Sequence, residues 1–337
     1  MKSRPDLALV GGWLCEGLEE LTADLAALDG RGRWVVVLPF EGAAVCARFA
    51  RWELAGRLPA GRAGAALPVP LGGWRTSLDR AAFGKGVDAI REAIAAGDVY
   101  QVNLCRRLSA DLPAGFDLVR FGEALLAAHP APHAAVVSLP SAGVLVASAS
   151  PERFLRRDGD VVESRPIKGT AASTDGFTAK DRAENVMIVD LVRNDLGRVC
   201  EYGSVVVSGL CEVEAHPGLF HLVSTVRGRL RAGVGWPELL EAAFPPGSVT
   251  GAPKLAALDV LAHLEPVSRS VYCGTVGWVD ADRGVGDLNV AIRTFWVEDG
   301  CLNLGVGGGI TWGSTAEGEW QETELKARRL LGAAAGA

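Results

Sequence analysis

The sequence predicts an α+β fold in which helices interrupt mostly antiparallel strands. Short apolar segments, such as residues 34–38, lie between Gly-rich turns, and Asp158-Gly159 is a hairpin signal. Helical periodicity is found separately, for example where apolar residues recur between 83 and 94. Strands that are joined by hairpins and interrupted by helices indicate antiparallel sheets rather than a parallel βαβ arrangement.

The individual elements follow from periodicity and turn residues along the chain. In chain order we expect a helix over 83–94 with Gly97 as its C-cap, a strand over 99–104, three strands between 134 and 165, a helix over 179–192, a strand over 288–293 that turns at Asp299-Gly300, and a last helix from about 314 to 331. No internal repeat is found, so a repeat architecture is not expected.

A boundary is expected near residue 75. The stretch 55–73 is rich in Gly, Ala and Pro, which is typical of a loop or a domain boundary. We therefore expect residues 1–75 to form a short N-terminal segment that packs on the core. Residues 76–337 would form the main domain and carry the chemistry.

Composition excludes several classes of protein. The chain has 337 residues, of which 49% are hydrophobic and 22% charged, as in a globular protein with a substantial core. Its net charge of −6 disfavours nucleic acid and anionic membranes as partners. The seven cysteines include no C-x-x-C pair, which indicates free thiols in a reducing compartment. Neither a signal-peptide pattern nor a membrane-spanning apolar run is found, so we expect a cytoplasmic protein.

Two pairs of acidic residues are spaced three apart on predicted helices. Asp181 and Glu184 form the first pair, and Glu319 and Glu322 form the second. This spacing puts both carboxylates on one helix face, roughly 5–6 Å apart. They are either solvated surface charges or oxygen ligands for Mg²⁺, which is commonly held by one or two carboxylates together with substrate oxygens and water. The pattern alone leaves both interpretations open.

A carboxyl group and an amine are expected to lie close together. Glu152 follows one predicted strand and Lys168 ends a later one, so the hairpin at Asp158-Gly159 can bring the two side by side. They could form a buried salt bridge, or a general acid beside a nucleophile. The second role requires burial or a nearby cation, because a lysine with its usual pKa of about 10.4 is mostly protonated.

Two glycine-rich stretches could bring backbone N–H groups close to an anion. Residues 305–309 are one of them, although a flexible turn is the more common explanation of such a run. Residues 247–254 are the other. This segment partly mimics a P-loop but lacks G-K-[ST], so nucleotide binding is rejected there.

A series of short motifs runs from about residue 78 to residue 332. They include G-D-V-Y-Q-V-N-L at 97–104, S-P-E-R-F at 150–154 and P-I-K-G-T at 166–170, followed by the segments 184–197, 221–224, 251–254, 272–274, 291–293, 307–309 and 319–326. In this order they resemble the chorismate-utilising family, which contains anthranilate synthase component I, aminodeoxychorismate synthase component I, and the isochorismate and salicylate synthases. The resemblance implies a large α/β sandwich of two mostly antiparallel sheets covered by helices, with the active site in the cleft between the sheets.

The resemblance also implies a set of site residues. By matching position, Mg²⁺ would be held by Glu184 and Glu322, with Asp181 and Glu319 as further ligands or water-mediated support. The residues that would contact chorismate are Gln101, Thr170, His221, Thr250, Tyr272, Arg293, Gly307, Gly308, Gly309 and Lys326. Lys168 and Glu152 would be the catalytic pair.

Two positions distinguish the branches of this family. Isochorismate and salicylate synthases carry a water-activating lysine where this chain has Gln101, which cannot act as a base, so ammonia is the expected nucleophile. Anthranilate synthases typically have alanine where this chain has Lys168, a lysine in aminodeoxychorismate synthases. Both positions imply amination of chorismate at C4, with Lys168 as nucleophile and Glu152 as general acid, on a route to 4-aminobenzoate and folate.

Two alternatives stay open at this point: the anthranilate synthase component I reaction, and a non-catalytic chorismate-binding subunit. The sequence contains no recognisable glutaminase triad. Ammonia is therefore expected from solution or from a separate glutamine amidotransferase subunit. Larger family members have a longer N-terminal region with a tryptophan pocket. No matching segment is found in residues 1–75, so inhibition by tryptophan is not expected.

Overall fold

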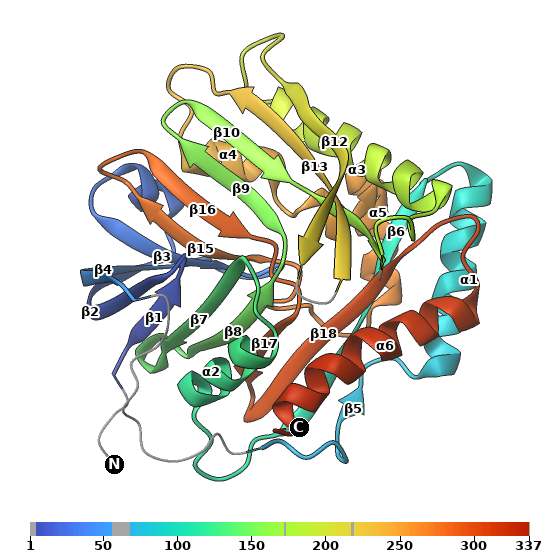
Figure 1. Ribbon diagram of the computed structural model, residues 1–337, viewed down its shortest axis with the longest axis horizontal. Helices are drawn as coiled ribbons and strands as arrows, with labels where there is room; N and C mark the ends of the chain where they lie inside the picture. The colour runs from blue at the N-terminus through green and yellow to red at the C-terminus, as the bar shows by residue number, and fades with distance from the viewer. Residues whose placement is uncertain (1–4, 56–67, 172, 217–218, 337) are drawn as a thin grey trace.

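Antiparallel pairing connects the strands in two series that meet at one hairpin (Figure 1). The computed structural model describes residues 5–55, 68–171, 173–216 and 219–336. The first series is, in order across the sheet, β6 (Gln101–Asp111), β18 (Cys301–Ile310), β17 (Thr294–Glu298), β8 (Val144–Ser150), β7 (His133–Leu139) and β1 (Leu7–Val10). The short strands β5 (Arg75–Thr76) and β14 (Gly251–Ala252) pair with β6.

The second series begins at β2, which forms a hairpin with β1. Its order is β2 (Trp13–Thr22), β4 (Val45–Leu54), β3 (Arg33–Leu38), β15 (Thr275–Asp280), β16 (Val285–Asn289), β9 (Arg153–Asp158), β10 (Val161–Arg165), β13 (Leu219–Arg229) and β12 (Val206–His216). Beyond the end of β10, β11 (Ile167–Ala171) continues the pairing with β13. The predicted α+β class with antiparallel sheets is confirmed.

Helices cover the two sheets and fill the spaces beside them. They are α1 (Arg80–Ala96), α2 (Leu118–Ala128), α3 (Ala179–Gly197), α4 (Trp236–Ala243), α5 (Lys254–Leu264) and α6 (Ala316–Ala334), with the short 3-10 turns η1 (Leu25–Asp29), η2 (Pro140–Ala142) and η3 (Gly247–Val249). In Figure 1, α6 and α2 lie in front of the first sheet. None of the helices that the structure describes is long and apolar enough to cross a bilayer.

Apolar side chains hold these layers together in separate clusters. Phe295 and Leu304 of the first sheet pack with Phe121 of α2 and Leu330 of α6, all of them buried. The largest cluster joins the second sheet to α3 and α4, and Trp236 is fully buried within it. Burying each large apolar side chain contributes about 1.5–3 kcal/mol to the stability of the fold. These clusters hold the helices against the two sheets.

Several predicted elements are confirmed and two are wrong. Gly97 caps α1 in the left-handed conformation, with φ 86°. Four strands, not three, lie between residues 133 and 165, because the chain leaves the first sheet after Ser150 and enters the second at Arg153. The strand expected over 288–293 ends at Asn289, where the N–H groups of Val290 and Ala291 turn to the carbonyls of Glu152 and Gly274, and Arg293 has a φ of 51° that a strand does not allow.

The expected boundary near residue 75 stays a prediction. Most of the stretch 55–73 lies outside the described residues. The strands before it are not a separate sheet, since β1 pairs with β7 and β3 pairs with β15. All seven cysteines are free thiols, as their spacing predicted.

Candidate active site

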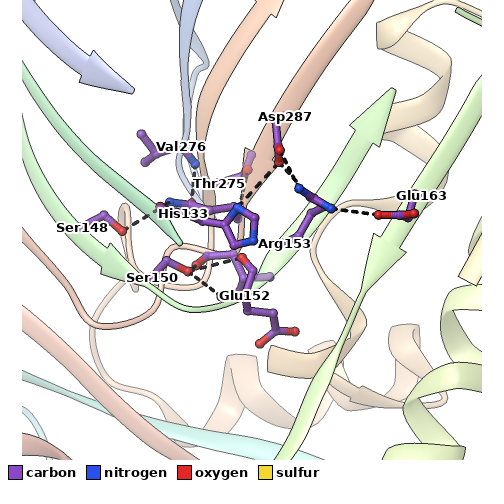
Figure 2. A network of polar contacts seen from close by, with 11 residues as sticks. His133, Ser148, Ser150, Glu152, Arg153, Glu163, Thr275, Val276 and Asp287 are labelled. Atoms are coloured by element: carbon purple, nitrogen blue, oxygen red, sulfur yellow. Dashed lines mark hydrogen bonds and ion pairs between the residues drawn. The ribbon is translucent and has the colours of Figure 1, made fainter. Parts of the chain in front are cut away.

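Glu152 lies at the crossing between the two sheets, where β8 has ended and β9 begins. Its backbone is fixed there by three hydrogen bonds: Glu152 N–H donates to Ser150 Oγ at 3.2 Å, Ser150 Oγ donates to the Val290 carbonyl at 2.6 Å, and Val290 N–H donates to the Glu152 carbonyl at 2.9 Å. Figure 2 shows that the carboxyl group points away from this network. The backbone is therefore anchored while the acid itself is presented elsewhere.

The residue after Glu152 ties four strands together. Arg153 donates two hydrogen bonds to Asp287 on β16, at 3.1 and 2.9 Å, and one to Glu163 on β10, at 2.8 Å. Arg227 on β13 binds the other oxygen of Glu163 at 2.6 Å. Figure 2 shows Arg153 between its two carboxylates. This ion-pair network fixes the strand that carries Glu152.

Lys168 reaches the same region from β11. The pairing of β11 with β13 shifts between Lys168 and Thr170, where Gly169 has a φ of 81°. A bulge of this kind redirects the neighbouring side chains. Lys168 Nζ donates a hydrogen bond to the carbonyl oxygen of Ser248, at 3.0 Å.

Burial drives the two groups toward their neutral forms. It raises the pKa of Glu152 to about 7, although the nearby Ser248, the charge of Lys168, the Ile167 N–H and the charge of Arg293 act in the opposite direction. Burial also lowers the pKa of Lys168, helped by the positive charge of Lys326. A protonated acid beside a neutral amine is the combination that acid-assisted nucleophilic attack requires.

Other predicted residues surround Lys168. Glu184 on α3 and Glu322 on α6 act against the lowering of its pKa, as Glu152 does, and Lys326 adds to it. The structure therefore brings together two catalytic candidates and residues of both predicted acidic pairs, from elements far apart in the sequence. Thr170 lies beside this group, and its hydroxyl is 3.0 Å from Nδ1 of the buried His221.

The glycine triplet forms the wall opposite Lys168, and it lies within β18 rather than in a flexible turn. A Cβ at Gly309 would collide with Gln101 Nε2 and lie 3.6 Å from Lys168 Nζ. A Cβ at Gly307 would come within 2.6 Å of Cys105 Sγ. Glycine is thus required at both positions by close approach of neighbouring atoms.

Gln101 projects toward Gly309 with an amide that has no hydrogen-bond partner among the described residues. The side chain is fully buried, and both its Nε2 and its Oε1 lack partners. A buried amide without partners costs about 1–3 kcal/mol of stability. The position therefore suits a polar ligand that supplies the missing hydrogen bonds.

The acidic residues of α6 lie beside Gly308, on the opposite face of β18 from the one that Gly309 presents to Lys168. A Cβ at Gly308 would lie 3.1 Å from Glu319 Oε2 and 3.9 Å from Glu322 Oε1. Burial raises the pKa of Glu319, whose carboxylate accepts a hydrogen bond from Ser314 at 2.5 Å. Burial also raises the pKa of Glu184, with Glu322 adding to the effect by charge repulsion. A cation bound between these carboxylates would offset their mutual repulsion.

The donor set fits Mg²⁺ only when substrate or water completes it. Among the described residues no three His, Cys, Asp or Glu side chains converge as a metal cage. Glu184 is within 3.6 Å of Lys180, and Glu322 is within 2.7 Å of Lys326. Mg²⁺ is nevertheless usually held by one or two carboxylates, with water and substrate supplying the other oxygens. Asp181 is occupied differently: it caps α3 by accepting hydrogen bonds from Thr178 N–H and hydroxyl, at 2.8 and 2.6 Å.

Two cationic side chains, Arg293 and Lys326, lie near this region, and they differ in their partners. The guanidinium of Arg293 makes no ion pair with any residue that the structure describes, and burial together with the charge of Arg329 lowers its pKa. Lys326 Nζ donates to the Gly307 carbonyl at 2.8 Å as well as pairing with Glu322. Both positions suit the carboxylates of an anionic ligand.

Thr250 and Tyr272 have neighbours of their own in the structure, and their predicted contacts with substrate stay predictions. The hydroxyl of Thr250 donates to the carbonyls of Pro246 and Gly247, at 3.2 and 3.3 Å, within the turn that contains it. The ring of Tyr272 packs against Gly305. Since strands rise about 3.3 Å per residue, Gly305 lies about 13 Å along β18 from Gly309.

Sequence reasoning missed Ser248. It contacts Lys168, and it lines a narrow cavity together with Glu152, Ser164 and Asp195. In the sequence, only its place inside the segment 247–254 points to it, because the glycines of that segment make it a candidate anion-binding loop. The same segment ends in Lys254, whose Nζ donates to Asp195 and to the Ala243 carbonyl, both at 2.8 Å.

The chain is similar in sequence to proteins of one known family. The profile of the family described as chorismate binding enzyme matches residues 46–332. An aminodeoxychorismate synthase component 1 from Klebsiella aerogenes is 42% identical over 271 residues, which are 77% of this chain and 59% of that protein. An anthranilate synthase component 1 from Streptomyces coelicolor is 42% identical over 282 residues, which are 79% of this chain and 54% of that protein. The chain thus spans less than two thirds of the length of either relative.

Solved structures share the fold. Anthranilate synthase component I from Streptococcus pneumoniae superposes with a TM-score of 0.78 and 24% identity, covering 97% of this chain and 90% of that one. MenF, the menaquinone-specific isochorismate synthase from Escherichia coli, gives a TM-score of 0.80 with 18% identity, covering 98% and 89%. At these identities the likeness establishes the architecture of two antiparallel sheets covered by helices.

Proposed function

Because this chain belongs to the chorismate-binding enzyme family, we propose that it aminates chorismate at C4 with ammonia to give 4-amino-4-deoxychorismate. One observation carries the proposal: Glu152 and Lys168 face the same enclosed region, and burial shifts the pKa of each toward its neutral form. A neutral amine can attack a carbon, and a protonated carboxyl can release a hydroxyl group as water. The product would serve a route to 4-aminobenzoate and folate.

Substrate binding would use the cations and the glycine wall. Arg293 and Lys326 would hold carboxylates of chorismate, and the ring would lie beside Lys168. Glu184 and Glu322 would hold Mg²⁺, which as a bound Lewis acid would neutralise the ring carboxylate and orient the substrate. On substrate binding, the ion pair between Glu322 and Lys326 would open so that each can take its own ligand.

In the first step the lone pair of Lys168 Nζ adds to C2 of chorismate. The two ring double bonds each move by one position, and the bond between C4 and its hydroxyl oxygen breaks. Glu152 gives its proton to that oxygen, so the hydroxyl departs as water and a carboxylate remains. Neutral Lys168 and protonated Glu152 are therefore required at the same moment.

In the second step ammonia adds to C4, and the double bonds move back. The bond between C2 and Lys168 Nζ breaks with its electron pair, so the lysine leaves as a neutral amine. The carboxylate of Glu152 takes the surplus proton of the new ammonium group. The two steps consume chorismate and ammonia, release water, and restore both residues to their starting forms.

The nucleophile at C4 is ammonia rather than water for a local reason. Gln101 lies beside Gly309 and Lys168, and an amide cannot remove a proton from water at neutral pH. A family member with lysine at this position would have a base there. Ammonia would come from solution or from a separate glutamine amidotransferase subunit, consistent with relatives whose names call them component 1.

The alternative function is that of anthranilate synthase component I, which aminates C2 and eliminates pyruvate. The 42% identity to such a protein from Streptomyces coelicolor favours it. Lys168 argues against it, because a lysine that adds at C2 blocks that carbon from ammonia and directs amination to C4.

Product analysis tests the proposal directly. The purified chain is incubated with chorismate, Mg²⁺ and ammonium at alkaline pH, and the products are separated by chromatography and identified by mass. We expect 4-amino-4-deoxychorismate without pyruvate release. Anthranilate and pyruvate in equal amounts would instead establish the alternative, and ligand binding without turnover would identify a non-catalytic subunit.

Removing either proposed Mg²⁺ ligand should weaken Mg²⁺ binding. For Glu184→Gln and for Glu322→Gln we expect the Mg²⁺ concentration that gives half-maximal turnover to rise at least tenfold, because each change removes one of two anionic ligands. The control is Glu317→Gln on the same helix, whose exposed carboxylate pairs with Arg80. Stabilisation of the protein against heat by Mg²⁺ with chorismate gives a second readout. Unchanged Mg²⁺ dependence in both variants would refute the assignment.

A further inference from the structure

Ser248 contacts both members of the proposed catalytic pair. Its carbonyl oxygen accepts the hydrogen bond from Lys168 Nζ, at 3.0 Å. Its hydroxyl is buried and makes no hydrogen bond of good geometry with any described residue, yet it lies close enough to the carboxyl of Glu152 to lower the pKa of that group. The two groups reach Ser248 from β11 and from the crossing between β8 and β9.

The turn that carries Ser248 is held rigidly on both sides. Arg269 Nη1 donates to the Val249 carbonyl at 2.7 Å, and Asn103 N–H donates to the Thr250 carbonyl at 2.8 Å. Gly247 allows the turn to approach α3, since a Cβ there would lie 2.6 Å from Leu191 Cδ2. Because its neighbours are fixed, Ser248 cannot withdraw from the pair without breaking these contacts.

The end of the turn is anchored by a buried ion pair. Lys254 Nζ donates to Asp195 of α3 and to the Ala243 carbonyl, both at 2.8 Å. The carboxylate and the ammonium are both largely buried, with 7% and 12% of their side-chain surface exposed. Removing one partner of such a pair is strongly destabilising. The anchor therefore fixes α5 and the turn before it to α3.

We propose that Ser248 is a positioning residue for the amination reaction, whose carbonyl holds the amine of Lys168 and whose hydroxyl holds the carboxyl of Glu152. This inference rests on the proposed function for the reaction it serves. In the reacting complex the hydroxyl would rotate to donate to one oxygen of Glu152, which would leave the other oxygen to carry the acid proton toward the substrate. One residue thus sets the relative position of nucleophile and acid.

The hydroxyl also adjusts how strongly Glu152 holds its proton. A hydrogen bond to the ionised form of a carboxyl group lowers its pKa, so loss of the hydroxyl should raise it. The charged groups that face Glu152 are Lys168 from β11 and Arg293 from the segment before β17. Asp195 and Arg153 also line the adjoining cavity, but Lys254 neutralises the first and Asp287 with Glu163 the second.

The test replaces the hydroxyl and keeps the carbonyl. For Ser248→Ala we expect the pH limb that belongs to Glu152 to move upward by about half to one unit. We expect kcat for 4-amination to fall about three- to tenfold, with little change in KM for chorismate. Ser248→Cys keeps the size and a weak donor and should shift the limb less, in the same direction. The matched control is Ser164→Ala, another buried serine of the same cavity, which should leave the limb in place.

A second readout does not depend on which reaction the enzyme catalyses. The titration of Glu152 is followed by carbon NMR on protein labelled in its glutamate carboxyl groups, and the signal is assigned by its loss in Glu152→Gln. We expect a midpoint near 7 in the wild type. The midpoint should rise in Ser248→Ala and stay unchanged in Ser164→Ala.

The two readouts separate the possible failures. If the wild type yields another product while Ser248→Ala still raises the Glu152 midpoint, the proposed function is wrong and the coupling of Ser248 to Glu152 stands. If the wild type aminates C4 but Ser248→Ala leaves both the midpoint and the pH limb unchanged, the role of Ser248 is refuted. An equal shift in Ser164→Ala would also refute it, because the effect would then be one of general packing.

Discussion

Replacing Lys168 with alanine should lower kcat/KM for 4-amination by at least about a thousandfold, because the variant has no amine to attack C2. The shift of its pKa supports this role: burial disfavours the ammonium, and Lys326 adds to the effect. Initial rates of 4-amino-4-deoxychorismate formation with ammonium as nitrogen source measure the loss. Residual turnover should be redirected away from C4.

The control for this variant is Lys180→Ala. Lys180 is an exposed lysine of α3 that pairs with Glu184 but does not contact the proposed reacting atoms. It should retain 4-amination within a few-fold of the wild type. Unchanged 4-amination in Lys168→Ala would rule out covalent catalysis by this residue.

Replacing Glu152 with glutamine should lower kcat by about 10²–10⁴-fold, the usual contribution of a positioned general acid. Glutamine keeps the size of the side chain and has no proton to give to the departing hydroxyl. The backbone contacts of residue 152 with Ser150 and Val290 do not involve the side chain, so the fold should persist. Steady-state rates together with an unchanged thermal midpoint check this.

The pH profile gives a sharper sign of the same role. The reactive form has one proton on the pair, on Glu152 and not on Lys168. The wild type should therefore show a bell-shaped profile, since adding or removing one proton stops the reaction. One limb should lie near pH 7, because burial raises the pKa of Glu152 to about 7. In Glu152→Gln only neutral Lys168 is needed, so activity should rise to a plateau. A descending limb that survives in the variant would contradict the assignment.

The sequence predicted local structure well where one segment determined it. The periodicity of α1 and the glycine that ends it are properties of neighbouring residues, and both are present. The prediction failed where distant segments decide. Residues 150–153 pass from one sheet to the other, and no local pattern indicates which sheet a strand will join. The alternating pattern of 288–293 likewise continues past the end of β16 at Asn289, because the N–H groups of Val290 and Ala291 bond to the distant Glu152 and Gly274.

The candidate site shows the same limit. The positions of Glu152 and Lys168 near one another followed from a hairpin, which is local information. The motifs supplied Glu184, Glu322 and Lys326 only through resemblance, because their approach to Lys168 depends on α3, α6 and β11 meeting in space. Ser248 accepts the hydrogen bond of Lys168 through a backbone carbonyl, which every residue has, so its identity gave no signal of that contact. Close approach to Gln101 explains Gly309, but that partner is two hundred residues away in the chain.

Mass spectrometry of the enzyme mixed with chorismate and Mg²⁺ in the absence of ammonia tests the central claim most directly. Without ammonia the second step cannot occur, so the lysine adduct should accumulate. We predict a mass gain of one chorismate less one water, confined to the peptide that contains Lys168 and absent from Lys168→Ala. An enzyme that aminates C4 when ammonium is added, yet forms no adduct or forms it at another residue, would contradict the account.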